Sequence, residues 1–598
     1  MTNRLFIIVL CFGALFFSCT RKNEVIPPAM PQEQKQKVVV YQLLTRLFGN
    51  TQTTNKPHGT VAENGTGKFN DITDTVLVEL RKLGITHVWY TGVIEHATMT
   101  DYSTYGISKD DPDVIKGRAG SPYAIKDYYD VDPDLAVDIN NRMKEFESLI
   151  ERTHNNNLKI LIDFIPNHVA RSYKSDNKPK GVKDLGEDDD VTKAFVPTNN
   201  FYYLPGESFK VTAENLAKAQ VLYPNKDGRY TENPAKVTGN DQFTSSPGMN
   251  EWFETVKLNY GVDIRNNKTT YFDPIPDTWE KMRDILLFWA NKKVDGFRCD
   301  VAEMVPVEFW NWVIPQVKKV NPEIIFIAEI YNPSAYKQYI ATGGFDFLYE
   351  KVKLYDTLRL LIDKKRKTRD IAAIQESLSG ITQHMLHFLE NHDEQRIASL
   401  FFAGNPFRAV PAMTISATID QGPVMIYFGQ EVGEPGKGAE GFGGDDGRTT
   451  IFDYWGVPEH QKWFNNGKCN DTLLSAGQKS LRDYYKTILN IAQTHTAITQ
   501  GVYADATLHN ITKANFGDDV HAFLRYTDST CLLIVNSFND VPTTVKIEIP
   551  DAQREELNYL KQTKAKDLLN SQNEITLSNF ETTLVLKPYS SFIFEFSK

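Results

Sequence analysis

The stretch VDGFRCD, residues 294–300, is an apolar run that ends in the acid Asp300. Two further stretches, EIIFIAE and MLHFLENHD, end in the same way at Glu329 and Asp393. Runs this apolar are typical of strands that are buried on both faces of a parallel sheet. Because barrel enzymes carry their active sites at the carboxyl ends of such strands, the three acids predict one site at one end of a parallel barrel.

Eight apolar runs of strand length recur along the chain, and stripes of helical period lie between several of them. Ile72, Val76 and Leu80 recur at helical spacing ahead of Gly84, a typical helix stop. Strands that alternate with helices predict a parallel sheet, and we expect the fold class α/β, a (β/α)8 barrel. The eight runs are residues 38–44, 86–92, 158–167, 294–302, 324–331, 345–350, 385–393 and 423–431.

Two segments depart from the barrel pattern. Residues 169–256 are polar and far longer than a usual strand-to-helix connection, so we expect an excursion (B) domain after the third strand. Beyond about residue 500, short alternating runs between turn residues predict a C-terminal antiparallel β-sandwich over residues 500–598. The catalytic barrel is then expected at residues 38–168 and 257–495.

The first residues predict export rather than a fold element. An apolar run at residues 5–17 ends in Ser18 and Cys19, and it is too short to span a membrane comfortably. A small residue directly before a cysteine resembles a bacterial lipobox. We therefore expect a lipoprotein signal peptide at residues 1–19, lipidation of Cys19, and a flexible tether at residues 20–37. The alternative is an ordinary cleaved signal with an incidental cysteine.

These features predict a place in the cell envelope. We expect a lipoprotein anchored to the membrane, at the outer membrane or its periplasmic face, with a secreted or periplasmic soluble protein as the alternative. The net charge of -10 and the pI near 5.7 argue against a nucleic-acid partner. Outside the signal, the odd set Cys299, Cys469 and Cys531 implies no disulfide framework.

Five short motifs occur in one order along the predicted barrel. They are DFIPNH at 163–168, VKLN at 256–259, GFRCD at 296–300, IAE at 327–329 and ENHD at 390–393. One such motif is weak evidence, but five in order are strong. In these motifs the chain after residue 38 resembles the α-amylase family of glycoside hydrolases (glycoside hydrolase family 13). At Lys257 it looks closer to the neopullulanase and cyclomaltodextrinase branch.

The resemblance implies a retaining mechanism carried by carboxylates. Retention needs a nucleophilic carboxylate and a carboxylic acid roughly 5 Å apart. The family pattern assigns Asp300 as nucleophile and Glu329 as acid/base. Asp393 resembles the third acid of the family, which binds ring hydroxyls and favours the distorted transition state. Arg298 stands two residues before Asp300, hence on the same strand face, where its guanidinium can hold that carboxylate ionised and oriented.

The same resemblance implies further groups that bind the sugar. His168 and His392 donate hydrogen bonds to its hydroxyls, and Tyr123 supplies a stacking face. A lone histidine at a strand end is more often structural, but joint placement beside three acids favours function. Four aromatic residues near the motifs are further candidates for sugar platforms, although packing is the expected role of each: Trp252, Tyr260, Trp310 and Trp455. The candidate site is catalytic Asp300, Glu329 and Asp393 with substrate-binding Arg298, His168, His392 and Tyr123.

Three positions, one in VKLN and two after Asp300, depart from the pattern of starch-cleaving members. Lys257 stands where calcium-dependent members have an aspartate ligand, and a lysine cannot bind Ca²⁺. Asn167 matches another ligand of that site, but one oxygen does not make the roughly six to eight that Ca²⁺ takes. We therefore expect no metal there and no required cofactor, with Ca²⁺ elsewhere left open. Glu303 and Met304 replace the Lys and His that often touch leaving-side sugars.

The expected function is retaining hydrolysis of α-glycosidic bonds in starch-derived oligo- or polysaccharides through a covalent glycosyl-enzyme. A transglycosylase of the same family, a glucanotransferase or maltosyltransferase, is the alternative, since a sugar hydroxyl can replace water. A non-catalytic glycan-binding lipoprotein is a third reading, against which the presence of all three acids argues. The expected partners are an α-glucan or maltooligosaccharide and, through the lipid anchor, the membrane.

Overall fold

The computed structural model describes residues 36–598 apart from residues 224 and 514. The predicted signal peptide, Cys19 and nearly all of the predicted tether lie outside the described residues. Within the described part of the chain, no helix combines the length and the apolar character that a membrane crossing requires.

Among the described residues, eight parallel strands form one sheet in the order β15-β14-β13-β12-β5-β2-β1-β16. A parallel bridge between His387 and Val424 joins the two end strands and closes the barrel. Each of the eight predicted runs contains one strand, so the predicted (β/α)8 barrel is confirmed. The strands are β1 (Val39–Leu44), β2 (His87–Thr91), β5 (Lys159–Phe164), β12 (Gly296–Cys299), β13 (Ile325–Ala328), β14 (Phe347–Tyr349), β15 (Met385–Leu386) and β16 (Val424–Tyr427).

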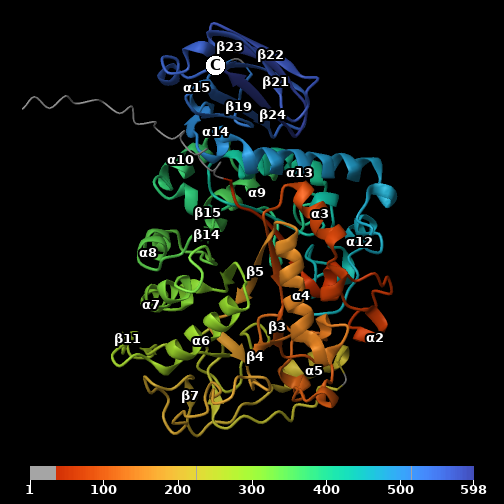
Figure 1. Cartoon of the computed structure of the whole chain (residues 1–598), viewed down its shortest axis with the longest axis vertical. Helices are drawn as coiled ribbons and strands as arrows, with labels where there is room; N and C mark the ends of the chain where they lie inside the picture. The colour runs from red at the N-terminus through yellow and green to blue at the C-terminus, as the bar shows by residue number, and fades with distance from the viewer. Residues whose placement is uncertain (1–35, 224, 514) are drawn as a thin grey trace, which may run out of the picture. The chain divides into compact units, whose positions relative to one another are not determined.

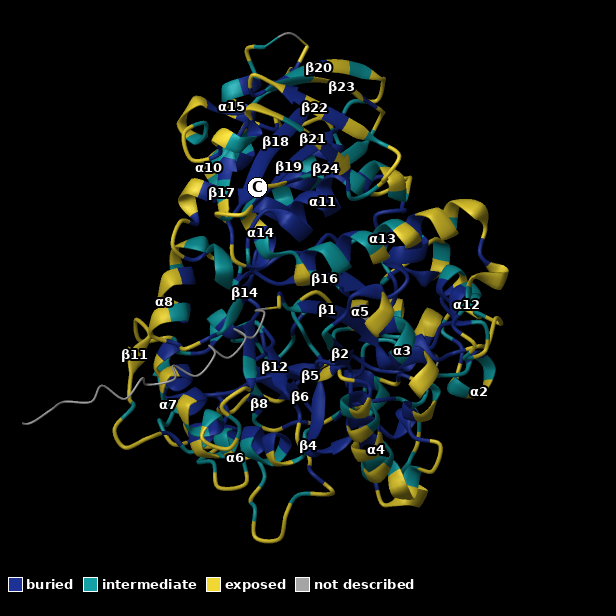
Figure 2. Ribbon diagram, turned by 45° about the horizontal axis from the view of Figure 1, so that its top comes forward, coloured by how far each residue is buried: buried dark blue, intermediate teal, exposed yellow. Residues whose placement is uncertain are grey.

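A helix follows each strand along the chain. Their apolar stripes pack on the sheet, and the interior is almost wholly buried (Figure 2). Thr73 caps the first helix, and Gly84 ends it at φ 102, where an added Cβ would lie 2.9 Å from the backbone nitrogen of Asn490. The helices are α3 (Asp74–Leu83), α4 (Arg142–Asn155), α6 (Asp277–Asn291), α7 (Val307–Lys318), α8 (Tyr336–Ala341), α9 (Asp356–Ile362), α11 (Val410–Thr418) and α13 (Ala476–Thr494).

The connection after β5, the third strand along the chain, leaves the barrel as predicted. It departs through β6 (His168–Ala170) and returns through β9 (Thr255–Lys257), and these strands pair antiparallel with His168 opposite Lys257. Between them lie β7 (Tyr203–Leu204), α5 (Ala213–Leu222) and β8 (Ala235–Lys236), drawn in yellow tones in Figure 1. A small apolar core of its own includes Tyr202 and Phe209. The excursion therefore stands on a two-stranded base.

The C-terminal part of the chain, blue in Figure 1, forms an antiparallel sheet in the order β17-β18-β19-β24-β21-β22-β23-β20. Arg525 of β18 ties it to the barrel side, because its guanidinium donates to the carbonyl oxygens of Ile498 and Gly501. The antiparallel C-terminal domain is thus confirmed. Its strands are β17 (Val502–Asp505), β18 (Val520–Tyr526), β19 (Thr530–Ser537), β20 (Thr543–Glu548), β21 (Gln562–Asp567), β22 (Glu574–Ser578), β23 (Glu581–Leu586) and β24 (Ser590–Ser597).

The cysteines that the structure describes, Cys299, Cys469 and Cys531, are buried free thiols. Cys299 is fully buried within the main apolar core, on the opposite strand face from Arg298. Burial raises the pKa of the Cys299 thiol well above its usual range, so the thiol stays protonated. It is a small core residue, as the alternation of the strand predicted.

Candidate active site

A fully buried arginine joins two acids at the carboxyl ends of β12 and β13. Arg298 Nη1 donates to Asp300 Oδ1 at 2.7 Å, and Arg298 Nη2 lies 2.7 Å from Glu329 Oε2. Arg298 Nε donates to the hydroxyl of Tyr349 at 3.3 Å. A planar guanidinium holds several partners at fixed angles, so one side chain orients both carboxylates through separate nitrogens.

Asp300 directly follows β12, as predicted, and burial raises the pKa of its carboxyl while Arg298 opposes that rise. His168, the first residue of β6, places Nε2 at 3.9 Å from Asp300 Oδ2. Burial lowers the pKa of His168 to about 4, so its imidazole is neutral at physiological pH. The pair is therefore a carboxyl group held by Arg298 beside a neutral imidazole ring.

Glu329 directly follows β13, and its two oxygens have different partners. Oε2 accepts from the backbone N–H of Val301 at 2.7 Å and faces Arg298, whereas Oε1 accepts from the hydroxyl of Tyr331 at 2.6 Å. Burial raises the pKa of Glu329, and the charge of Asp300 adds to this while Arg298 opposes it. A carboxyl with a raised pKa suits a general acid.

Tyr123 and His392 form one wall of the site. Their rings stack with centroids 5.1 Å apart, and the Tyr123 hydroxyl lies 2.6 Å from His392 Nε2. Gln42 Nε2 lies 2.8 Å from His392 Nδ1, so Nδ1 accepts and the ring proton belongs on Nε2. Burial lowers the pKa of His392 well below its usual range, which agrees with this neutral tautomer. His392 can thus donate from Nε2.

Asp393 corrects the expectation that every acid ends a strand. β15 stops at Leu386, and Asp393 lies in the loop beyond it. Asn391 Oδ1 accepts the backbone N–H groups of Asp393 and Glu394, and this turn presents Asp393 with Oδ2 at 3.1 Å from His392 Nε2. Partial burial and the neighbouring charge of Glu329 raise the pKa of Asp393 to about 7.

Six of the seven predicted site residues line one cavity of about 170 Å³, and Arg298 lies beneath it, in contact with the acids. Trp252, for which packing was expected, also lines the cavity, with its ring centroid 5.2 Å from that of His168. The lining is Lys116, Ser121, Tyr123, His168, Trp252, Glu254, Thr255, Asp300, Val301, Glu329, His392, Asp393, Ile451 and Phe452.

Asp163 belongs to the site although the sequence suggested no role for it. It accepts from Trp89 Nε1 at 3.0 Å and lies 3.5 Å from Arg298 Nη1, and burial raises its pKa to about 7. The available signal was its place as the first residue of DFIPNH, because β5 and β12 pair with Asp163 in register with Arg298. Tyr331 was also missed, although it stands only two residues after Glu329.

The position expected to lack a metal holds an ammonium instead. Lys257 of β9 is buried, and its Nζ donates to Asn167 Oδ1, lies 2.9 Å from Asp241 Oδ1 and lies 3.5 Å from the carbonyl oxygen of Met304. These oxygens come from the loop between β5 and β6, from the excursion and from the 3-10 turn after β12. Because one cation already holds them, the residues do not fit Ca²⁺ at this place.

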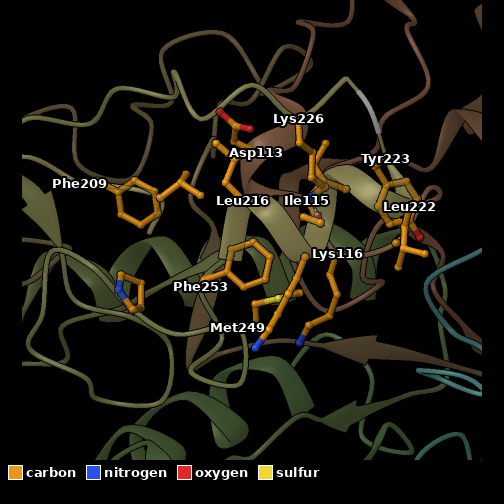
Figure 3. A pocket seen from close by; sticks show the side chains of 15 residues that line it. Asp113, Ile115, Lys116, Phe209, Leu216, Leu222, Tyr223, Lys226, Met249 and Phe253 are labelled. Carbon is orange, nitrogen blue, oxygen red and sulfur yellow. Dashed lines mark hydrogen bonds between the residues drawn. The ribbon is translucent and has the colours of Figure 1, made fainter. Parts of the chain in front are cut away.

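A second cavity, of about 280 Å³, lies against α5 and shares Lys116 with the cavity that the acids line. Figure 3 shows Phe209, Leu216, Met249 and Phe253 around it. Its surface is almost wholly apolar, whereas hydroxyl-rich ligands need converging hydrogen-bonding groups. The polar cavity with the acids is therefore the one suited to a sugar.

The sequence matches the family model for the α-amylase catalytic domain over residues 42–501. Alpha-amylase 3 of Dictyoglomus thermophilum is 23% identical over 500 residues, which cover 79% of this chain and 82% of that protein. A cyclomaltodextrinase of a Bacillus species is 21% identical over 540 residues, 85% of this chain and 73% of that one. An α-amylase structure from Geobacillus thermoleovorans, complexed with acarbose, has a TM-score of 0.61 at 17% identity and covers 95% of this chain and 100% of that chain. The chain therefore belongs to the α-amylase family and is a glycosidase-type enzyme.

Proposed function

We propose that this enzyme is a retaining hydrolase that cleaves α-glycosidic bonds in starch-derived oligo- or polysaccharides. The observation that supports this most is the shared guanidinium of Arg298, which holds Asp300 and Glu329 by separate nitrogens while both acids face one cavity. Two carboxyl groups held side by side at one cavity are what retaining cleavage requires, one as nucleophile and the other as acid/base.

In the proposed mechanism, Asp300 attacks the anomeric carbon while Glu329 gives its proton to the leaving glycosidic oxygen. The sugar is then bound as an ester of Asp300. Glu329, now ionised, takes a proton from water, and the resulting hydroxide attacks the anomeric carbon. The bond to Asp300 breaks, which releases the sugar and restores the Asp300 carboxylate and the protonated Glu329. Each step moves one proton through Glu329, so the same carboxyl serves first as acid and then as base.

The remaining polar groups would bind the ring at the cleavage point. His168 and His392 are neutral and offer N–H donors to the hydroxyl groups of the sugar. Asp393, which lines the same cavity, offers carboxyl oxygens as acceptors. Tyr123 presents an aromatic face stacked on His392. The sugar ring flattens as it approaches the transition state. Hydrogen bonds that become stronger at that point lower the activation barrier more than they strengthen binding of the unreacted substrate.

Product analysis on maltoheptaose, amylose, pullulan and cyclodextrin tests this proposal. A hydrolase yields only shorter saccharides, with one new reducing end for each bond cleaved. Longer oligosaccharides formed early would instead assign the transglycosylase alternative, because that enzyme uses the same residues with a sugar hydroxyl in place of water. Binding of maltoheptaose without any product would contradict both enzymatic readings.

We further propose that the enzyme needs no calcium at the base of the excursion, since Lys257 joins there the groups that a metal would join. The lipid anchor at Cys19, and with it a place at the bacterial cell envelope, also remains a proposal. Labelling with a radioactive fatty acid tests it: the native chain should incorporate label, and Cys19→Ser should not.

A further inference from the structure

Glu329 uses its two oxygens for different purposes. Oε2 is occupied, because it accepts from the backbone N–H of Val301 and faces Arg298, each at 2.7 Å. Oε1 therefore remains as the oxygen that can carry a proton to the leaving group. It accepts a hydrogen bond from the hydroxyl of Tyr331 at 2.6 Å. This short contact fixes the torsion of the carboxyl group about its last bond.

Tyr331 is itself held from a different loop. Glu303 lies in the 3-10 turn Ala302–Met304 after β12, and its Oε1 accepts the backbone N–H of Tyr331 at 3.0 Å. Its Oε2 accepts the next N–H, that of Asn332, at 3.2 Å. One carboxylate thus fastens the loop after β13 to the loop after β12. Glu303 is one of the positions at which the sequence departs from the starch-cleaving pattern.

We propose that Tyr331 is the positioning residue of the acid/base, and that Glu303 acts through it by fixing the backbone that carries it. This inference rests on the proposed role of Glu329. The tyrosine hydroxyl donates to Oε1 and holds it at one place and orientation, from which a proton carried by Oε1 can pass to the glycosidic oxygen of the substrate. This gives a role to Glu303: where other members carry residues that touch the leaving sugar, this chain carries a carboxylate that holds the backbone of Tyr331 and, through Tyr331, orients Glu329.

The hydrogen bond also affects titration. A donor to an ionised carboxylate favours the ionised form, so Tyr331 lowers the pKa of Glu329 against the larger rise caused by burial. Removal of the hydroxyl leaves the other groups in place. The charged and titratable groups that act on Glu329 are Arg298, Asp300, His168, Tyr349, Asp393 and Tyr331.

The test is the pH profile of kcat/KM for hydrolysis of maltoheptaose. Because Glu329 must be protonated to act, a higher pKa moves the basic limb to higher pH. Tyr331→Phe should move that limb upward by about one pH unit, as expected for one hydrogen bond to a charged group. KM should change less than kcat, since the hydroxyl acts on Glu329 and not on the sugar.

Glu303→Gln tests the path to Tyr331 without altering the tyrosine. The amide keeps one acceptor oxygen in place of two, so a smaller shift in the same direction is expected. Glu308→Gln is the matched control: Glu308 is exposed in the first turn of α7 and loses the same charge. Its profile should equal that of the unmodified enzyme, and thermal melting checks that each variant is folded.

Glu329→Gln separates this inference from the proposed function. With an aryl α-maltoside whose leaving group needs no acid, this variant should retain activity and lose the basic limb. A basic limb that persists would refute the role of Glu329 itself. If the limb belongs to Glu329 but Tyr331→Phe leaves it unmoved, the positioning role of Tyr331 alone is overturned. The positioning role is supported if the basic limb of the pH profile moves upward in Tyr331→Phe and Glu303→Gln but stays in place in Glu308→Gln.

Discussion

Replacement of Lys257 by Met should measure how firmly the excursion is fastened to the barrel. The substitution keeps an apolar stem of similar length and removes the ammonium that Asn167, Asp241 and the Met304 carbonyl share. These partners belong to three separate segments, so the loss acts on the attachment of the excursion rather than on either core. The expected result is a less stable protein with an unchanged fold.

The geometry sets the size of the effect. Removing one partner of a fully buried ion pair costs about 3–5 kcal/mol. The Asp241 side chain is 32% exposed, however, so water can solvate it once the ammonium is gone. We therefore expect about 2–3 kcal/mol, discounted for this solvation. At about 2 °C per kcal/mol for a domain of this size, Tm should fall by about 4–6 °C.

Thermal melting of the enzyme and its variants, each with EDTA and with added Ca²⁺, provides the assay. Lys193→Met is the control, because Lys193 lies in the same excursion but its side chain is 65% exposed and pairs with the partly exposed Asp190. That variant should melt within about 1 °C of the unmodified enzyme. Equal melting of the two variants would refute the reasoning. So would a loss of more than about 5 °C when EDTA is added to the unmodified enzyme, since that much stability would come from a bound metal.

Three further outcomes follow from the site. Asp300→Asn should lower turnover by about 10⁴-fold or more with an unchanged Tm, and a tenth of normal activity would contradict its role as nucleophile. Proton NMR of the first products should show the α anomer, whereas early β anomer would indicate inversion. Arg298→Lys should reduce kcat/KM by about 100-fold, because one ammonium cannot make the separate contacts of the guanidinium with Asp300 and Glu329. Activity within twofold of normal would contradict that orienting role.

The barrel could be predicted because its strands must be apolar on both faces, and each predicted run indeed contains a strand. The length of a strand could not be predicted in the same way. The apolar part of MLHFLENHD extends to Leu389, yet β15 pairs only over Met385–Leu386. Pairing length depends on how the neighbouring strands twist and where they end, which hydropathy does not record. That is why Asp393 was expected at a strand end and lies in a loop.

The part of the candidate site that could be predicted consists of the residues that directly follow barrel strands. Parallel strands bring their carboxyl ends together, so Asp300 and Glu329 had to meet once their strands were identified. Residues delivered by loops could not be placed in advance. Trp252 enters the cavity from the end of the excursion, and Tyr331 turns back onto Glu329 because a side chain from another loop holds its backbone. Such contacts depend on the path of the loop, which no local pattern specifies.

The two-stranded base of the excursion has a mechanical consequence. His168 and Lys257 stand opposite each other in the β6-β9 pair, one facing the catalytic cavity and the other gripping Asp241. Because β6 and β9 are joined by backbone hydrogen bonds, a change in the orientation of one strand also reorients the other. Any bending of the excursion toward or away from a bound saccharide must therefore rotate the histidine as well. The orientation of the excursion is thus coupled to that of the proposed sugar-binding histidine, and a ligand that bends the excursion is expected to alter turnover without touching an acid.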